Sequence, residues 1–232
     1  MDDNSNWPYI VALFPGLVAL FIAIWHKWLE SLLFNPKLII VFDKNSPDIA
    51  LIPTDYHFED KTIKDVEVYW FRFRVKNDSK VTTAKNVEVY VKQIEEKQKD
   101  GEYILRKWSM PLNLTWSHTG GKIYFESIPP QMERPCDLGH IIPPMKWPEI
   151  GSRIPGSKVI GPVTLFTIGY KTIPKRQESY RLEPHTYKFH LLVTASNVRR
   201  PKPYEVILDF DGTWSGEKED MLKSCVSVEF KK

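Results

Sequence analysis

Cysteine, glycine and catalytic motifs are scarce in this chain of 232 residues. Its two cysteines, Cys136 and Cys225, lie far apart without a CxxC spacing, which excludes a disulfide framework and predicts two ordinary thiols. We find no GxSxG, HExxH or GxGxxG motif and no phosphate-binding glycine loop. A formal net charge of +3 is too small to indicate a dedicated nucleic-acid binder. These absences favour a protein with neither enzymatic activity nor a cofactor.

Formal charge is also missing from one region, residues 4–25. Inside it, Tyr9–Trp25 reads YIVALFPGLVALFIAIW and contains no strongly polar side chain. An apolar run of this length predicts one helix that crosses the hydrocarbon core of a bilayer. Aromatic residues at both edges are typical of the headgroup zone, and here they are Trp7, Tyr9, Trp25 and Trp28. We therefore expect a membrane anchor in residues 1–34 and a soluble domain in residues 35–232.

The charges on the two sides of this apolar run differ in sign. Asp2 and Asp3 precede it without any Lys or Arg, whereas Lys27, Lys37 and Lys44 follow it. Because Lys and Arg near a span are retained in the cytoplasm, we expect the N-terminus outside and the C-terminal domain in the cytoplasm. The alternative, a cleaved signal peptide, would need a basic start and small residues after the apolar core, where this chain has the bulky WHKWLESLLF.

Small residues recur on one face of the predicted span. Ala12, Gly16, Ala19 and Ala23 are spaced at i, i+4, i+7 and i+11, so a second helix could approach this face closely. This pattern predicts a homo-oligomer or a membrane-protein partner. The alternative is that Ala and Gly are simply common in membrane-spanning helices.

The strongest signal after the span is strand-like alternation. Within Val66–Asn77, one face carries Tyr69, Phe71, Phe73 and Val75, which is typical of a half-buried strand. Ala84–Glu96 alternates in the same way beyond a polar turn, so we expect these two strands to pair as a long antiparallel hairpin. A second polar turn, residues 97–101, leads into a third predicted strand, Glu102–Trp108.

Further short strands are predicted on both sides of this central region. They are Leu38–Phe42, Ala50–Pro53, Val163–Tyr170, Thr186–Ala195, Tyr204–Phe210 and Val226–Phe230, with a single helical turn at Glu217–Leu222. Eighteen prolines, eleven glycines and 13% aromatic residues also suit a β-rich domain with many loops better than a helical bundle. We therefore expect an all-β domain of antiparallel strands.

The stretch VYWFRFRVKNDSKVTTAKNVEVYVKQIEE resembles strand pairs in immunoglobulin-like β-sandwich modules of uncharacterised prokaryotic surface and membrane proteins. In those modules an aromatic-rich strand ends in VxN, a polar turn follows, and an AxNVxV strand returns. The resemblance implies an immunoglobulin-like antiparallel β-sandwich. It implies no site residues, because such modules share no common activity.

Residues 109–162 contain nine prolines and little regular patterning. Short strands are predicted at Lys122–Phe125 and Cys136–Ile142, joined by loops that proline stiffens. Since a simple sandwich needs only about 100 residues, we interpret this region as an irregular insertion.

One cluster of side chains has metal-binding chemistry. His118, Cys136, Asp137 and His140 could bind zinc if their loops converge. Residues 136 and 140 would share a face of a regular strand. The spacing matches no standard zinc pattern, however, and an ordinary buried thiol beside surface histidines explains the same residues.

Two predicted loops are basic. One contains Lys175 and Arg176, and the other contains Arg199 and Arg200. If both loops lie at one end of the sandwich, they could contact anionic headgroups or another anionic ligand. The alternative is ordinary solvated charge, which Glu178 and Glu183 would dilute.

Together these patterns predict a non-enzymatic single-pass membrane protein whose bilayer-bound helix carries a cytoplasmic β-sandwich. The sandwich would serve as an interaction or sensing module. Two alternatives remain open: an accessory subunit of a larger membrane assembly, and a metal-dependent enzyme that uses the histidine, cysteine and aspartate cluster.

Overall fold

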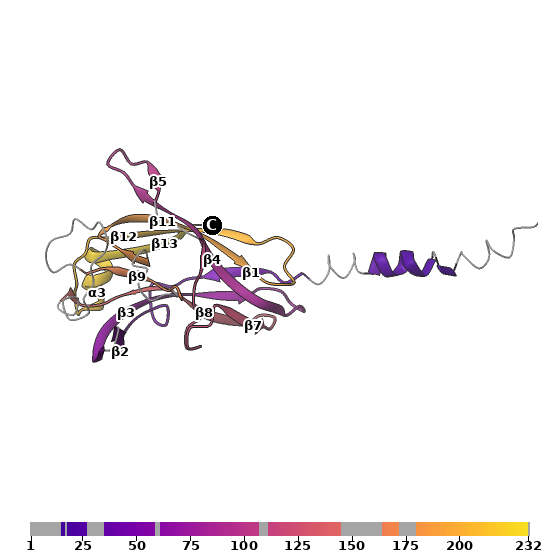
Figure 1. Cartoon of the computed structure of the whole chain (residues 1–232), viewed down its shortest axis with the longest axis horizontal. Coiled ribbons are helices and arrows are strands. Elements are labelled where there is room, and N and C mark those ends of the chain that lie inside the picture. The colour runs from indigo at the N-terminus through magenta and orange to yellow at the C-terminus, as the bar shows by residue number, and fades with distance from the viewer. Residues whose placement is uncertain are drawn as a thin grey trace, which may run out of the picture.

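The computed structural model describes residues 15–16, 18–26, 35–58, 61–106, 111–144, 164–171 and 180–231. Residues 15–16 and 18–26 are helical, and among the described residues no helix is long and apolar enough to cross a membrane. Residues 1–14, 17 and 27–34 lie outside the described part of the chain. They hold a large share of the predicted span, together with Trp7, Tyr9 and Trp28. In Figure 1 the helix is drawn beyond one end of a two-layered β-structure.

Two antiparallel sheets pack face to face as a sandwich. The first sheet follows the order β1-β3-β8-β9-β10, and β2 also pairs with β3. Its strands are β1 (Leu38–Val41), β2 (Ile49–Phe58), β3 (Lys61–Asn77), β8 (Glu133–Ile141), β9 (Phe166–Ile168) and β10 (Arg181–Leu182).

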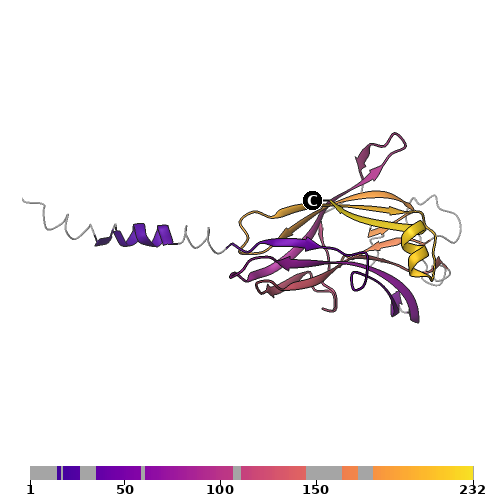
Figure 2. The same ribbon diagram turned by 180° about the vertical axis from the view of Figure 1, so that it is seen from behind.

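The second sheet follows the order β13-β12-β11-β4-β5, with β6 and β7 also paired to β4. Its strands are β4 (Ala84–Lys97), β5 (Tyr103–Leu105), β6 (Leu112–Asn113), β7 (Tyr124–Ile128), β11 (His185–Thr194), β12 (Lys202–Phe210) and β13 (Val226–Lys231). A helical turn, α3 (Lys218–Asp220), continues into a π-helical turn, η3 (Met221–Cys225), before β13. Figures 1 and 2 place this turn at the end of the sandwich away from the N-terminal helix.

The core lies between the two sheets and follows the alternation of the sequence. Tyr69, Phe71 and Phe73 of β3 are fully buried, and Phe189 of β11 and Val206 of β12 meet them from the second sheet. Both cysteines are free and buried in this core. Two faces that each present a row of apolar side chains are what a sandwich requires, because neither sheet can bury its row alone.

The expected hairpin between β3 and β4 is wrong. The two strands belong to different sheets: β3 pairs with β1, β2 and β8, whereas β4 pairs with β5, β6, β7 and β11. Alternation specifies which side chains face the core, but it does not specify the neighbouring strand. The polar residues 78–83 carry the chain across the sandwich, so both apolar rows face one core.

The next connection agrees with the sequence. Residues Glu95 to Lys97 of β4 pair with Leu105 to Tyr103 of β5 in antiparallel register, as expected for the turn at residues 97–101. In Figure 1 this hairpin projects from the body of the sandwich.

Part of the stretch expected as an irregular insertion belongs to the two sheets. Strand β8 lies between β3 and β9, and its neighbour β7 pairs with β4 in the other sheet. Pro129 and Pro130 lie in the β7–β8 turn, and Pro143 and Pro144 follow β8. Pro135 lies within β8 opposite Arg74, ahead of residues 139–141, which pair with β9. Residues 145–162 lie outside the described part of the chain.

Candidate functional site

The four predicted metal ligands do not converge. Cys136 pairs with Phe73 and lies in the core, whereas Asp137 pairs with Arg72 and His140 with Trp70 on the other face of the sheet. The register of β8 shifts between these pairs, and this bulge places residues 136 and 140 on opposite faces.

His118 is exposed in a turn, where its φ angle is 60°. Among the described residues, no group of three or more His, Cys, Asp or Glu side chains is arranged to hold a metal ion. The condition on which the zinc interpretation depended, convergence of these four residues, is therefore not met in the described structure, and the bulge in β8 is one reason.

The Asp137 carboxylate makes hydrogen bonds that join neighbouring parts of the fold. Its Oδ1 atom accepts hydrogen bonds from Arg72 Nε at 3.1 Å and from Ser117 Oγ at 2.5 Å. Burial raises the pKa of Asp137, and the contacts with Ser117 and Arg72 partly oppose this rise. The carboxylate thus joins β8 to β3 and to the turn before β7.

His140 packs against Trp70, with ring centroids 4.7 Å apart. Burial lowers the pKa of His140 to about 4, and the nearby charge of Arg181 adds to this effect. The imidazole is therefore neutral near pH 7. Its role in the described structure is packing on the outer face of the first sheet.

The helical segment presents apolar side chains to its surroundings. Six large side chains, those of Val18, Leu20, Phe21, Ile22, Ile24 and Trp25, are between 41% and 64% exposed. The small residues Gly16, Ala19 and Ala23 lie on the same helical segment and are also exposed, whereas Ala12 lies outside the described residues. A Cβ atom added at Gly16 would meet nothing within 4 Å. Space for a second helix is therefore open at this position.

The chain enters the sandwich at an end formed by three loops. Asn35 Oδ1 accepts a hydrogen bond from the Arg199 backbone N–H at 3.3 Å, and Lys37 O accepts one from the Asp78 backbone N–H at 2.7 Å. We define the basic end as residues 35–39, 76–85, 127–134 and 193–203, which comprise these loops and the adjoining strand residues.

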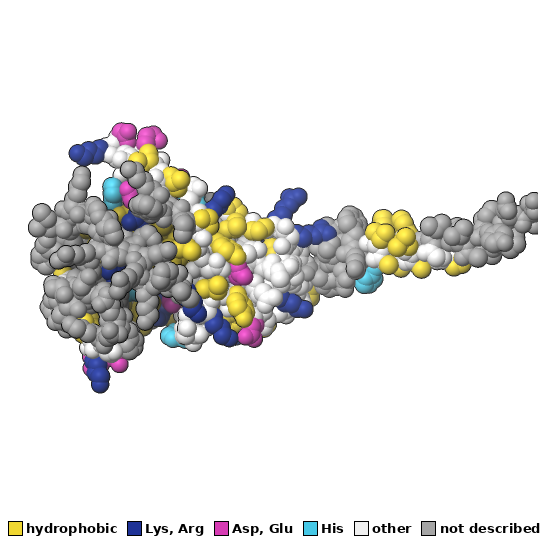
Figure 3. All heavy atoms as spheres, in the orientation of Figure 1, with side chains coloured by type: hydrophobic (Ala, Val, Ile, Leu, Met, Phe, Trp, Pro, Cys, Tyr) yellow, Lys and Arg dark blue, Asp and Glu magenta, His cyan; other side chains and the backbone are white. Residues whose placement is uncertain are grey.

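Positive charge is concentrated at the basic end. Its four segments contain eight Lys or Arg residues and two acidic residues, a balance of +6, although the whole chain carries only +3. The basic residues are Lys37, Lys76, Lys80, Lys85, Arg134, Arg199, Arg200 and Lys202. Dark-blue side chains are visible in Figure 3 at this end of the sandwich, toward the helix. The remainder of the chain is therefore net negative, with a balance of −3.

Only one of the two basic loops predicted from the sequence is described. Arg199 and Arg200 are exposed at the basic end. Lys175 and Arg176 lie outside the described residues, so a shared surface of the two loops stays a prediction. Sequence reasoning missed Lys80 and Lys85, because only the fold brings them beside Arg199.

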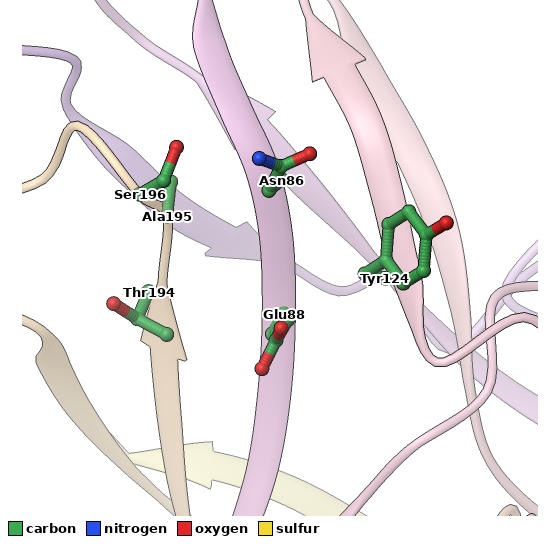
Figure 4. Close-up of a pocket in the computed structure, with 6 residues that line it drawn as sticks. All are labelled: Asn86, Glu88, Tyr124, Thr194, Ala195 and Ser196. Atoms are coloured by element: carbon green, nitrogen blue, oxygen red, sulfur yellow. The ribbon is translucent and has the colours of Figure 1, made fainter.

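An open groove lies next to the basic end on the outer face of the second sheet. It has a volume of about 560 Å³ and is lined by Asn86, Glu88, Tyr124, Thr194, Ala195 and Ser196. Figure 4 shows these side chains on β4, on β7 and at the end of β11 with the two residues that follow it. The Glu88 carboxylate accepts hydrogen bonds from Tyr90 Oη and, at 3.1 Å, from Asn113 Nδ2. The groove is polar, and its carboxylate is already held by neutral donors.

A second groove, of about 490 Å³, lies between the edges of the two sheets. Phe42 and Phe230 stack in it with ring centroids 4.7 Å apart, and Tyr204 Oη donates to Leu38 O at 3.3 Å. No sequence pattern predicted either groove, because each is formed by strands that are distant in the chain. Comparison with known proteins adds no assignment: no protein-family model, curated protein or solved structure matches this chain.

Proposed function

We propose that the chain is a single-pass membrane protein that presents an immunoglobulin-like β-sandwich as an interaction module on the cytoplasmic side of the bilayer. The proposal depends most on the uncharged N-terminal segment, residues 4–25, whose helical part exposes large apolar side chains. Such side chains favour a lipid environment over water. The mechanism is tethering, because confinement to a membrane raises the effective concentration of the module for partners on the same surface.

The immunoglobulin-like assignment is supported by strand order. The chain crosses between sheets from β3 to β4, β8 then returns beside β3, and β11 follows beside β4 with β12 on its other side. This succession resembles the alternation between sheets in immunoglobulin-type sandwiches. Strands β9 and β10 depart from it, because they follow β8 in the chain and extend the same sheet.

Membrane insertion and orientation can be tested separately in cells that express the full chain. We expect the chain to stay in the membrane pellet after alkaline extraction, and its recovery in the supernatant would contradict insertion. For orientation, a cysteine is introduced by Ser5→Cys near the N-terminus or by Lys99→Cys in the exposed β4–β5 turn. A membrane-impermeant maleimide should label the first variant in intact cells and the second only after lysis. The unmodified chain is the control, since Cys136 and Cys225 are buried.

The second candidate function is that of an accessory subunit in a membrane assembly. The open space at Gly16 favours it, because a glycine on an exposed helix face allows close approach of another helix. Gly16→Ile should abolish co-purification of a stoichiometric membrane partner in detergent if this candidate is correct. Gly16→Ala is the matched control, and a chain that purifies without such a partner would contradict the candidate.

A further inference from the structure

We infer that the basic end of the sandwich docks on an anionic lipid surface, so that the module stands end-on with the α3 end directed away from the bilayer. This inference rests on the proposed membrane anchor. It adds a partner, namely anionic headgroups, and a defined orientation.

The first argument is charge complementarity. Eight basic and two acidic residues are grouped at the basic end, and the rest of the chain is net negative. Lys80, Lys85, Arg199 and Arg200 are all exposed there. An anionic leaflet attracts basic residues that lie within about one Debye length, roughly 8 Å at physiological salt. Because the rest of the chain is net negative as a whole, the charge distribution favours an orientation with the basic end toward the leaflet.

The second argument is the position of exposed apolar side chains. Val81 is 68% exposed and follows Lys80, and Met132 is 46% exposed on the neighbouring loop. The two loops are joined by hydrogen bonds, since the Gln131 side chain donates to Ser79 O at 2.9 Å and the Gln131 backbone N–H donates to Asn77 O at 2.8 Å. Exposed apolar side chains at an end that is net basic suit the headgroup and acyl boundary.

The third argument is the short tether. Asn35 belongs to the basic end, and the described helical residues continue to His26. Nine residue steps separate these positions, so they can be no more than about 30 Å apart. The basic end is thus the part of the sandwich that the anchor holds nearest to the headgroups.

The loops of the basic end are also held to one another by hydrogen bonds. Asn197 Nδ2 donates to Thr83 O at 2.8 Å, and Asn197 Oδ1 accepts from the Lys85 backbone N–H at 2.9 Å.

The test uses the full chain reconstituted in vesicles of phosphatidylcholine, with or without one-third phosphatidylglycerol. Ser127→Cys introduces a labelling site for a fluorophore at the basic end, and Gly216→Cys does so near α3, where an added Cβ meets open space. Lipids with a nitroxide on the headgroup quench nearby fluorophores. At about 0.1 M salt we expect quenching at position 127 to be at least about two-fold stronger with phosphatidylglycerol, and to fall to the phosphatidylcholine level at about 0.5 M salt. Position 216 should show no such dependence.

Charge reversal then identifies the docking residues. Lys80→Glu, Arg199→Glu and Arg200→Glu together should remove the effect of phosphatidylglycerol at position 127. The matched control, Lys97→Glu, Lys99→Glu and Lys223→Glu, changes the charge equally at the opposite end and should retain it. If the charge-reversed variant misfolds, the salt dependence of quenching at position 127 in the chain with its native Lys and Arg residues still tests the inference.

Two contrary outcomes are distinguishable. If the labelled chain floats with both kinds of vesicle but position 127 is quenched equally in both, docking on anionic lipid is wrong and the anchor stands. If the chain does not float with either kind of vesicle, the anchor is wrong and the docking inference falls with it.

Discussion

The two ends of the sandwich are stabilised in different ways. At the basic end, short loops are joined by polar contacts, and the buried Asn77 side chain donates to Thr82 O at 2.7 Å and to Ile128 O at 2.9 Å. At the α3 end, apolar packing dominates. Met221 is fully buried in η3, and Trp214 packs on Tyr69 with ring centroids 5.0 Å apart.

This comparison suggests that the residues that stabilise each end of the sandwich are mostly different from its exposed charged residues. Hydrogen bonds of uncharged side chains and the backbone join the loops of the basic end, and a charged pair adds to them, since Lys37 Nζ donates to Asp78 Oδ2 at 2.9 Å. We therefore expect three other cations of this end, Lys80, Arg199 and Arg200, to contribute little to stability because they are exposed. Four experiments test this separation, from the largest expected effect to the smallest.

The largest effect is expected at the α3 end from Met221→Ala. This change empties a fully buried site in the core, and we expect it to lower the free energy of unfolding by about 3 kcal/mol. Denaturant unfolding of the full chain in a mild detergent measures the loss. Leu222→Ala, one residue along η3 at a partly buried position, is the control and should lose clearly less. An equal loss at both positions would mean that η3 does not close the core.

Asn77→Ala should have the next largest effect, at the basic end. It removes the side-chain hydrogen bonds to Ile128 O and to Thr82 O, of which Thr82 O keeps a hydrogen bond from Ser79 Oγ at 2.9 Å. We expect a loss of about 2 kcal/mol in the free energy of unfolding. The control is Asn45→Ala, because the Asn45 side chain makes an exposed hydrogen bond to Asp43 Oδ1 and its backbone hydrogen bonds are unaffected by the change. A loss below that of the control would show that the loops are held by something other than Asn77.

The sequence predicted those features of the fold that depend on a single strand, such as which of its faces is buried. Alternation identified the buried row of Tyr69, Phe71 and Phe73 because side chains in a strand alternate between faces. It did not reveal that β3 and β4 lie in different sheets, since strand partners depend on contacts distant in the sequence. Strand β8 was underestimated because its flanking prolines resemble those of an irregular loop.

The candidate site was less predictable for related reasons. A single bulge in β8 separates Cys136 from His140, and residue counting assumes regular alternation. The sequence singled out Arg199 and Arg200 as a local pair. It could not add Lys80 and Lys85, which reach the same surface only because β4 and β11 are neighbours in the second sheet.

The two ends should also differ in their response to acid. His140 lies toward the other end of β8, and its pKa is lowered to about 4 because the ring is buried as the neutral form. Because the unfolded chain binds this proton near pH 6.5, the stability that the neutral ring contributes is present above that pH and is lost as the pH falls toward 4. Between pH 7 and pH 5 the loss should be about 2 kcal/mol.

His140→Phe tests this expectation, because it keeps an aromatic ring against Trp70 without the titration. The slope of unfolding free energy against pH should become shallower in this interval for the variant. The variant His185→Phe, at an exposed histidine, should keep the slope of the parent chain. Identical slopes for all three proteins would contradict the burial of a neutral His140.

The smallest effect is expected from reversing the charge of Lys80, Arg199 and Arg200 to Glu. These side chains are exposed, so their replacement should change the free energy of unfolding by less than about 0.5 kcal/mol each. Denaturant unfolding in neutral detergent is the measurement, and Asn77→Ala is the internal reference for a change at the same end. A loss as large as that of Asn77→Ala would mean that the cations hold the loops, which would remove the separation between stability and charge. A small loss, combined with altered behaviour on anionic vesicles, would assign these cations to binding, because the same three residues would then matter to the membrane and not to the fold.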